Sequence, residues 1–282
     1  MPIGTLYLVA TPIGNLSDMS PRAKETLMAA DFLAAEDTRV THKLLSALGL
    51  PSKPMISYYE HNRRQRGEEI LQKILAGETC ALVTDAGTPA VSDPGEDLVA
   101  LCAENGVQVL SIPGCCAAVN ALAVSGLPTG RWCFEGFLSM NKKARREHLD
   151  SLRGEQRTMI FYEAPHKLRA TLDDLREYFG ADRRIALCRE LTKLHEETLR
   201  MTLADAVAYY TENAPRGEYV LILEGASDVP TQETEDDRMQ RALEAVQSRI
   251  DAGETLKDAV KMVSADMGVK KNALYKLALG EN

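Results

Sequence analysis

Short apolar segments alternate with longer helical segments through the first 124 residues. Residues 6–10, 32–35, 80–83 and 107–112 are nearly continuous apolar runs, as expected of strands that are buried on both faces. One of the intervening helices is expected to begin at Ser20-Pro21, because serine caps helix starts well and proline is tolerated in the first turn. Strands joined by helices of this length need crossover connections, so the sequence predicts an α/β fold with a mostly parallel sheet.

A second α/β unit is predicted after the linker-like segment 125–130. Its last apolar runs are separated by short gaps that permit antiparallel pairing, so we expect a mixed sheet. Residues 227–237 form a polar segment typical of a linker, and the pattern beyond it is helical only, with a helix-turn-helix spacing. The predicted domains are residues 1–124, 125–227 and 228–282, the last a small helical domain.

Composition narrows the class of protein. No apolar run approaches the roughly 18–20 residues that a membrane helix needs, and the start lacks the layout of a signal peptide, so we expect a cytoplasmic protein. The six cysteines form no C-x-x-C pair and mostly lie in apolar runs, which predicts reduced thiols and no zinc site. The net charge of -8 argues against binding naked nucleic acid by bulk electrostatics, although local basic patches at 61–66, 142–146 and 270–276 remain available.

Four unusual loops follow strands of the first predicted sheet, at the edge where parallel sheets bind ligands. They lie at residues 11–15, 36–39, 84–95 and 112–115. Their small residues let a ligand approach the backbone, and Asp85 adds a carboxylate that can hold a ribose or a cationic group. A tight turn explains any one of these loops, but four on one edge favour a binding site. None has the pattern of a dinucleotide or triphosphate loop.

The second unit places titratable groups directly after two apolar runs, in Phe-Tyr-Glu-Ala-Pro-His at 161–166 and Arg-Glu-Leu-Thr-Lys at 189–193. His166, His195 and Glu196 lack the spacing of zinc ligands. No nucleophile-elbow motif of a hydrolase is present. These two segments are therefore candidates for substrate or cofactor contact.

Seven segments, taken in order, resemble one family of enzymes. They are TPIGNL from Thr11, AEDTR from Ala35, DAGTP from Asp85, IPG from Ile112, FYEAPH from Phe161, REL-TK from Arg189 and GEYVLILEG from Gly217. The family is the tetrapyrrole methylase-like (class III) S-adenosylmethionine-dependent methyltransferases. Within it, the chain resembles members that methylate the 2′-oxygen of a cytidine in the decoding region of 16S ribosomal RNA. The resemblance covers nearly the whole chain, including residues 270–276.

The resemblance implies that S-adenosylmethionine binds in a cleft between the two α/β units, and that the protein is a homodimer acting on 16S rRNA, within the assembled small ribosomal subunit. It also implies that the protein binds no metal ion and does not associate with a membrane. One departure is the pair Cys115-Cys116, where relatives often have small residues. By motif position, the cofactor-binding residues would be Pro12, Asp85, Ala86, Gly87, Thr88, Cys116, Ala117, Tyr162 and Leu191.

A ribose hydroxyl must lose its proton during methyl transfer, so a positioned base should help. In order of preference the candidates are Glu36, Asp37, Glu163, His166 and Glu190; ion pairs that brace the domain interface are the alternative role for each. Two rival functions stay open: a tetrapyrrole or corrinoid C-methyltransferase, and a non-catalytic nucleic-acid-binding protein. The residues expected to contact RNA are Arg39, Arg63, Arg64, Lys142, Lys143, Arg145, Arg146, Arg189, Lys193, Lys270 and Lys271.

Overall fold

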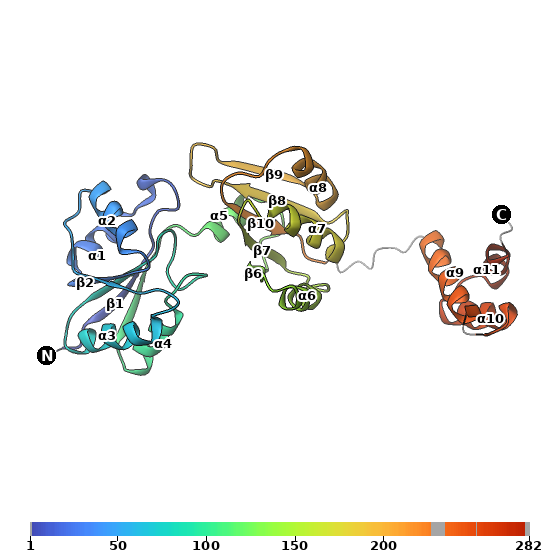
Figure 1. The fold of residues 1–282 in the computed structure, drawn as a ribbon, viewed down its shortest axis with the longest axis horizontal. Coiled ribbons are helices and arrows are strands. Elements are labelled where there is room, and N and C mark those ends of the chain that lie inside the picture. The colour runs from blue at the N-terminus through green and yellow to red at the C-terminus, as the bar shows by residue number, and fades with distance from the viewer. Residues whose placement is uncertain (1, 227–234, 252, 280–282) are drawn as a thin grey trace. The chain divides into compact units, whose positions relative to one another are not determined.

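The computed structural model of the protein describes residues 2–226, 235–251 and 253–279 (Figure 1). The chain separates into two compact units, Met1–Ala226 and Ser227–Asn282. The first unit contains two five-stranded sheets, and the second is helical. Within the described ranges, no helix combines the length and the apolar character needed to cross a membrane.

The first sheet is entirely parallel, with strand order β3-β2-β4-β1-β5. This confirms the predicted parallel sheet. The central strands β2 and β4 are buried along their whole length, because helices cover both faces. The elements are β1 (Thr5–Val9), α1 (Pro21–Ala29), β2 (Phe32–Ala35), α2 (Thr38–Ala47), β3 (Met55–Ser57), α3 (Arg63–Leu75), β4 (Cys80–Val83), α4 (Glu96–Glu104) and β5 (Gln108–Ile112), with a 3₁₀ turn at Leu16–Asp18.

The start of α1 shows how the sequence sets an element boundary. Ser20 is the N-cap residue, and its hydroxyl oxygen accepts a hydrogen bond of 3.1 Å from the Ala23 amide. Pro21 follows at the first helical position, where its missing N–H leaves no hydrogen bond unmade. The predicted helix start is confirmed.

The second sheet is mixed, as predicted: β6 and β7 are parallel, and the remaining pairs in the order β6-β7-β10-β8-β9 are antiparallel. One face packs on α6, α7 and α8 around a core that includes Phe161, Leu172 and Tyr210. The elements are α5 (Ala117–Val124), β6 (Trp132–Phe137), α6 (Lys142–Ser151), β7 (Thr158–Glu163), α7 (Leu168–Phe179), β8 (Arg184–Arg189), β9 (Glu197–Thr202), α8 (Leu203–Glu212) and β10 (Tyr219–Leu223).

Helix α5 joins the two sheets. It follows β5 of the first sheet, yet its buried residues Ala118, Ala121 and Leu122 pack against the other face of the second sheet. The Cys188 thiol on β8 contacts the Ala121 carbonyl at 3.7 Å. The predicted boundary after residue 124 counts α5 with the first domain, whereas its packing ties it to the second.

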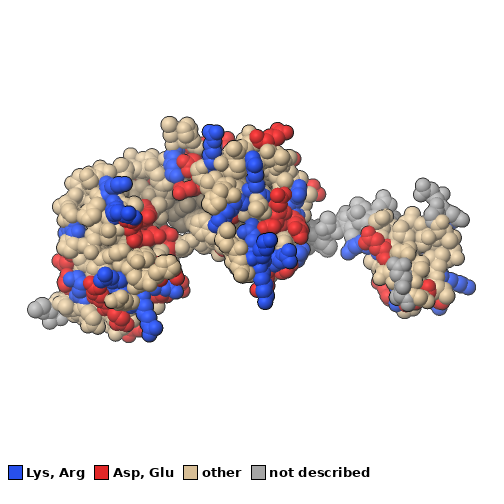
Figure 2. Space-filling model, viewed as in Figure 1, with Lys and Arg blue, Asp and Glu red and all other residues tan. Residues whose placement is uncertain are grey.

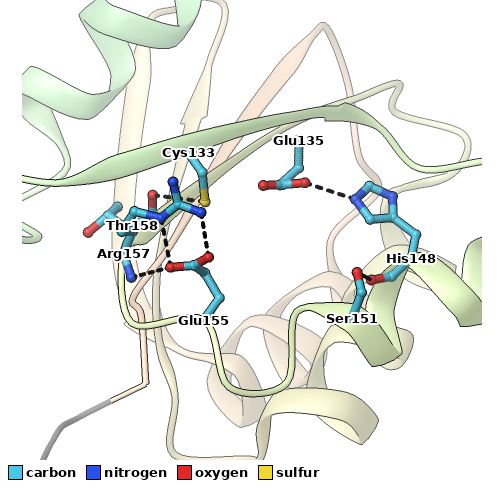
Figure 3. A network of polar contacts seen from close by, with 7 residues as sticks. All are labelled: Cys133, Glu135, His148, Ser151, Glu155, Arg157 and Thr158. Carbon is cyan, nitrogen blue, oxygen red and sulfur yellow. Dashed lines mark hydrogen bonds and ion pairs between the residues drawn. The ribbon is translucent and has the colours of Figure 1, made fainter.

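Polar side chains from β6, β7 and α6 lie near one another at the edge of the second sheet (Figure 3). His148 on α6 and Glu135 on β6 lie 2.9 Å apart, and the Arg157 guanidinium makes two hydrogen bonds to the Glu155 carboxylate beside β7. Burial raises the pKa of Cys133 to about 12, so this thiol stays protonated. The contact between His148 and Glu135 links the basic helix α6 to β6.

In its described residues, the second unit is a cluster of three helices, α9 (Glu235–Asp251), α10 (Leu256–Asp266) and α11 (Lys271–Ala278). Buried Val246, Val260 and Leu274 form its core. The predicted polar linker over 227–237 is wrong at its end, because 235–237 begin α9; acidic residues are favoured in the first turn of a helix. Residues 227–234 lie outside the described part of the chain.

Candidate active site

A cavity of about 440 Å³ lies where the carboxyl edge of the first sheet faces the second sheet. The space-filling view shows the surface hollowed between these two halves of unit Met1–Ala226 (Figure 2). The lining residues come from the loops after β1, β4, β5, β7 and β8, from the strands β6, β7, β8 and β10 with the residue before β10, and from the start of α5. They are Ile13, Ala86, Gly87, Thr88, Val91, Ser92, Asp93, Cys116, Ala117, Phe137, Tyr162, Glu163, Ala164, Pro165, Cys188, Glu190, Leu191, Lys193, Glu218, Tyr219 and Val220.

The loop after β4 forms the wall from the first sheet. Gly87 and Thr11 exchange two backbone hydrogen bonds of 2.9 and 3.1 Å, and the Thr88 hydroxyl donates to the Cys115 carbonyl at 2.8 Å. Gly87 has φ +92°, a conformation that side-chain-bearing residues rarely adopt. The three small-residue loops are thus tied together, and their backbone borders the cavity.

The same loop continues through two strained residues. Ala90 and Ser92 have φ values of +63° and +69°, which cost energy for residues that carry a Cβ. Such strain concentrates at functional sites. Asp93 follows this strained turn and lines the cavity, three residues before α4 begins at Glu96.

Aromatic side chains form part of the opposite wall. The Tyr162 hydroxyl accepts a hydrogen bond of 3.1 Å from the Ala118 amide, which fixes the ring, and burial raises its pKa to about 12. Phe137 packs edge-on against this ring with centroids 5.6 Å apart, yet is 57% exposed. Phe137 therefore presents an open aromatic surface beside the cavity.

An ion-paired cluster completes the second wall. The Lys193 ammonium lies 2.9 Å from a Glu190 carboxylate oxygen and 2.8 Å from one of Glu218. The ammonium, as hydrogen-bond donor, lowers the pKa of Glu190. A Cβ at Gly217 would clash with the Glu190 side chain, and a Cβ at Gly14 would clash with the Lys193 side chain, so a larger residue at either position would displace the cluster. This cluster joins the first loop of the chain to the second sheet.

Glu163 is the most buried carboxylate of the cavity, with 4% of its surface exposed. It accepts hydrogen bonds from the Thr171 hydroxyl and from the Ala164 amide. Thr171 in turn accepts one from Arg145 at 2.9 Å. These contacts hold β7 against α7.

The predicted catalytic residues separate into two groups. Glu163 and Glu190 line the cavity, whereas Glu36, Asp37 and His166 do not, and His166 is exposed. Asp37 caps α2 and pairs with Arg39 at 2.6 Å; the hydrogen bonds from Arg39 lower its pKa to about 2, which makes it a weak base. Burial raises the pKa of Glu36, which accepts a hydrogen bond of 3.4 Å from the Asp85 amide.

Most of the predicted cofactor-binding residues meet at the cavity. Pro12 and Asp85 do not line it; the Asp85 carboxylate instead accepts from the Asp37 amide at 3.3 Å, which links the ends of β4 and β2. Burial raises the pKa of Asp85. The residues that do line the cavity are Ala86, Gly87, Thr88, Cys116, Ala117, Tyr162 and Leu191.

The structure scatters the predicted RNA-contacting residues. Lys142, Lys143 and Arg146 are exposed on α6, which coincides with the blue group at the lower edge of the second half in Figure 2. Arg145 instead turns inward and pairs with Asp174.

The remaining predicted RNA contacts lie elsewhere. Arg63 pairs with Asp97 at 2.9 Å, and Arg189 pairs with Glu197 at 3.0 Å. Arg39 and Arg64 are exposed in the first half, while Lys193 lines the cavity. Lys270 and Lys271 border a shallow pocket of the helical unit, which is described separately.

Sequence reasoning gave no role to Asp93 or Phe137, although both line the cavity. The loop containing Asp93 was recognised, but only the fold shows which of its side chains faces inward. Phe137 ends a strand and carries no local signal of function. In the described ranges, no group of three or more His, Cys, Asp or Glu side chains is placed to hold a metal ion.

Comparison with known proteins identifies the class to which this fold and cavity belong. The family model described as Tetrapyrrole (Corrin/Porphyrin) Methylases matches residues 5–207. The solved structure of uroporphyrin-III C-methyltransferase from Thermus thermophilus complexed with S-adenyl homocysteine has a TM-score of 0.54 at 18% identity, covering 78% of this chain and 97% of that one. A diphthine synthase structure gives 0.60 at 12% identity, over 78% and 90%. The chain belongs to the tetrapyrrole methylase family.

Relatives that match along almost the whole chain place it more narrowly. "Ribosomal RNA small subunit methyltransferase I" from Synechocystis sp. is 47% identical over 98% of both chains. The protein of that name from Halalkalibacterium halodurans is 46% identical over 97% of this chain and 94% of its own, and the one from Bacillus subtilis is 42% identical over 97% and 93%. Within the tetrapyrrole methylases, the chain is a member of the ribosomal RNA small subunit methyltransferase I group.

Proposed function

We propose that this chain transfers a methyl group from S-adenosylmethionine to the 2′-oxygen of a cytidine ribose in the decoding region of 16S ribosomal RNA, acting as a homodimer in the cytoplasm on the assembled small subunit. The observation that carries the proposal is the identity of 40–47% to small-subunit methyltransferases over 97–99% of this chain. That similarity extends beyond residue 207, where the tetrapyrrole methylase family model ends.

The cavity suits the proposed cofactor. Its volume of about 440 Å³ falls in the usual range for small-molecule sites, roughly 300–1,000 Å³. Gly87, Ala86 and Ala117 leave backbone accessible, so a ligand can be held by main-chain groups. When bound, S-adenosylmethionine supplies a methyl group on a positively charged sulfur, and the nearby carboxylates of Glu36, Asp85 and Asp93 favour a cation.

Two features support an RNA acceptor. Phe137 offers an exposed ring at the cavity, and single-stranded ribonucleotides are commonly recognised by stacking on aromatic side chains. The exposed cations of α6, Lys142, Lys143 and Arg146, lie on the same half of the unit and suit phosphate contact. A net charge of -8 then confines RNA contact to local patches.

The test is to offer labelled S-adenosylmethionine with three acceptors: small subunits that lack the modification, free 16S RNA and a tetrapyrrole. Label in the small-subunit RNA supports the proposal, and more label in subunits than in free RNA supports the assembled subunit as substrate. Label in the tetrapyrrole and none in RNA would support the tetrapyrrole alternative and overturn the proposal. Sedimentation of the full chain tests the homodimer.

A further inference from the structure

A second cavity lies at the same end of the second sheet as the candidate active site, on the face that packs on α8. Its volume is about 260 Å³, and it lies where the end of α8 meets the end of β8 and the starts of β9 and β10. We call it the α8 pocket. Its lining residues are Arg189, Glu197, Tyr209, Tyr210, Asn213, Ala214, Arg216 and Tyr219.

The α8 pocket adjoins the active-site cavity, and Tyr219 borders both. Arg189 lines the pocket while its neighbour Glu190 lines the cavity, and Arg216 lines the pocket while Glu218 lines the cavity. Because consecutive Cα atoms are about 3.8 Å apart, these two segments form a thin wall between the two spaces. An extended ligand that leaves the cavity across this wall reaches the α8 pocket.

The two spaces differ in charge. Four carboxylates and one ammonium line the active-site cavity, whereas two guanidinium groups and one carboxylate line the α8 pocket. An RNA strand carries a phosphate on each side of the ribose that is methylated, and phosphates are held by Arg and Lys. The acidic cavity repels these phosphates, so the pocket next to it is the better place for one of them.

Arg216 is the cation of the pocket that is available to a ligand. Its backbone N–H donates to the Tyr219 hydroxyl at 3.1 Å, but its exposed side chain has no ion pair or hydrogen bond with any described residue. The Arg189 side chain, by contrast, makes contacts of 3.0 and 3.1 Å with the Glu197 carboxylate. The Arg216 guanidinium therefore keeps its donors for a phosphate.

Tyr209 supplies an aromatic surface at the same place. Its side chain is 38% exposed, and its ring packs edge-on against Tyr210, which packs edge-on against Tyr219; the centroid distances are 5.0 and 5.9 Å. The two inner rings are buried, so they support the outer one. Unstacked bases of single-stranded RNA commonly stack on such exposed rings.

We propose that the α8 pocket holds a nucleotide of the RNA strand that directly flanks the methylated cytidine, with its phosphate on Arg216 and its base stacked on Tyr209. The inference rests on the proposed function, in which RNA is the acceptor. Neither residue lines the active-site cavity, so both act as positioning residues. They hold the strand so that the neighbouring ribose enters the cavity.

The first test measures KM and kcat for small subunits that lack the modification. KM should rise at least about fivefold in Arg216→Met and in Tyr209→Leu, since a stacked base or a phosphate contact contributes that much or more, while kcat changes less than about twofold. Tyr209→Phe keeps the ring and should keep the wild-type KM. The matched control is Arg131→Met, an exposed arginine before β6 that lies outside both cavities.

Two further measurements separate positioning from a structural role. The Tm and the calorimetric affinity for S-adenosylhomocysteine should match the wild-type values in all four variants. A lowered Tm in Tyr209→Leu would assign a structural role to that ring, and the exposed side chain of Arg216 then decides the question. An unchanged KM in Arg216→Met, or an equal rise in Arg131→Met, overturns the proposal.

The second test identifies the nucleotide in the pocket. The full chain would be bound to small subunits with S-adenosylhomocysteine and irradiated with ultraviolet light, and the nucleotide attached to the peptide that contains Tyr209 would be identified by mass spectrometry. The expected nucleotide lies directly before or after the methylated cytidine. A crosslink to a remote part of the RNA, or none to this peptide, contradicts the proposal.

The two proposals fail in different ways. A wild-type chain that transfers no methyl group to small-subunit RNA contradicts the proposed function. If the wild type is active and Arg216→Met keeps its KM, only the role of the α8 pocket is overturned. A loss of affinity for S-adenosylhomocysteine in Arg216→Met also overturns that role, in favour of an effect on the cofactor site.

Discussion

The two sheets that border the cavity hold their acidic side chains in opposite ways. At the edge of the first sheet, Glu36, Asp85 and Asp93 lie near one another, and none of them has an ion pair in the described part of the chain. At the edge of the second sheet, Glu190 and Glu218 share the Lys193 ammonium. The first edge therefore keeps negative charge available to a cation or a proton, whereas at the second edge one ammonium offsets part of the charge of two carboxylates.

The two sheets also differ in how much main chain they present to the cavity. The first sheet presents Gly87 and neighbouring small residues, whose main-chain groups border the cavity. The second sheet presents side chains, and Tyr162 is fixed by its bond to the Ala118 amide. The contrast indicates that the first half holds the cofactor through its backbone, and that the second half shapes the space for the acceptor.

The largest effect on cofactor affinity is expected from Gly87→Val, which adds a side chain where the main chain borders the cavity. A side chain at φ +92° costs roughly 1–2 kcal/mol and projects a Cβ toward Ile13. Binding of S-adenosylhomocysteine, measured by calorimetry, should weaken by about tenfold or more. Gly49→Val is the matched control, because Gly49 also has positive φ but has open space around it and lies outside the cavity. Equal loss of affinity in both variants would contradict a specific role for Gly87.

A smaller effect is expected from charge reversal on the second half. Lys142→Glu with Lys143→Glu should weaken RNA binding several-fold and reduce its salt dependence, while affinity for S-adenosylhomocysteine stays unchanged. Each lost phosphate contact should lower the slope of log K against log salt by about 0.7 to 0.9. The control is Arg22→Glu with Lys43→Glu, two exposed cations on α1 and α2. Equal weakening of RNA binding and cofactor binding would argue against α6 as an RNA surface.

The smallest effect is expected from Lys193→Met, which removes the shared cation of the second edge. Because Lys193 lowers the pKa of Glu190, the stability from this contact is present above the unfolded pKa of glutamate and is lost as the pH falls through the lowered value. Urea unfolding near pH 7.5 should show a loss of about 1 kcal/mol that disappears in acid. Lys143→Met is the control, since its pair with Glu147 is exposed and 3.8 Å long. A loss that persists in acid would contradict this account.

The sequence predicted the scaffold well because its signals are local. Apolar runs such as 80–83 indicate strands that are buried on both faces, and Ser20-Pro21 indicates a helix start. Both signals depend only on neighbouring residues. The small-residue loops were located for the same reason, since the carboxyl edge of a parallel sheet follows from the order of its elements.

What the sequence could not predict depends on contacts between distant segments. Asp37 was a plausible base until the structure paired it with Arg39, and Arg145 was a plausible RNA contact until it paired with Asp174. Asp93 gains its environment from Glu36, which is 57 positions away in the sequence. Each of these roles is set by packing, which no local pattern encodes.

The most direct test of the central claim is the chemical position of the transferred methyl group. The wild-type chain would be incubated with small subunits that lack the modification and with S-adenosylmethionine carrying a labelled methyl group, and the 16S RNA would then be digested to nucleosides for mass spectrometry. The account predicts label in one 2′-O-methylcytidine from the decoding region. Label on a base, or no label in the RNA, would contradict it.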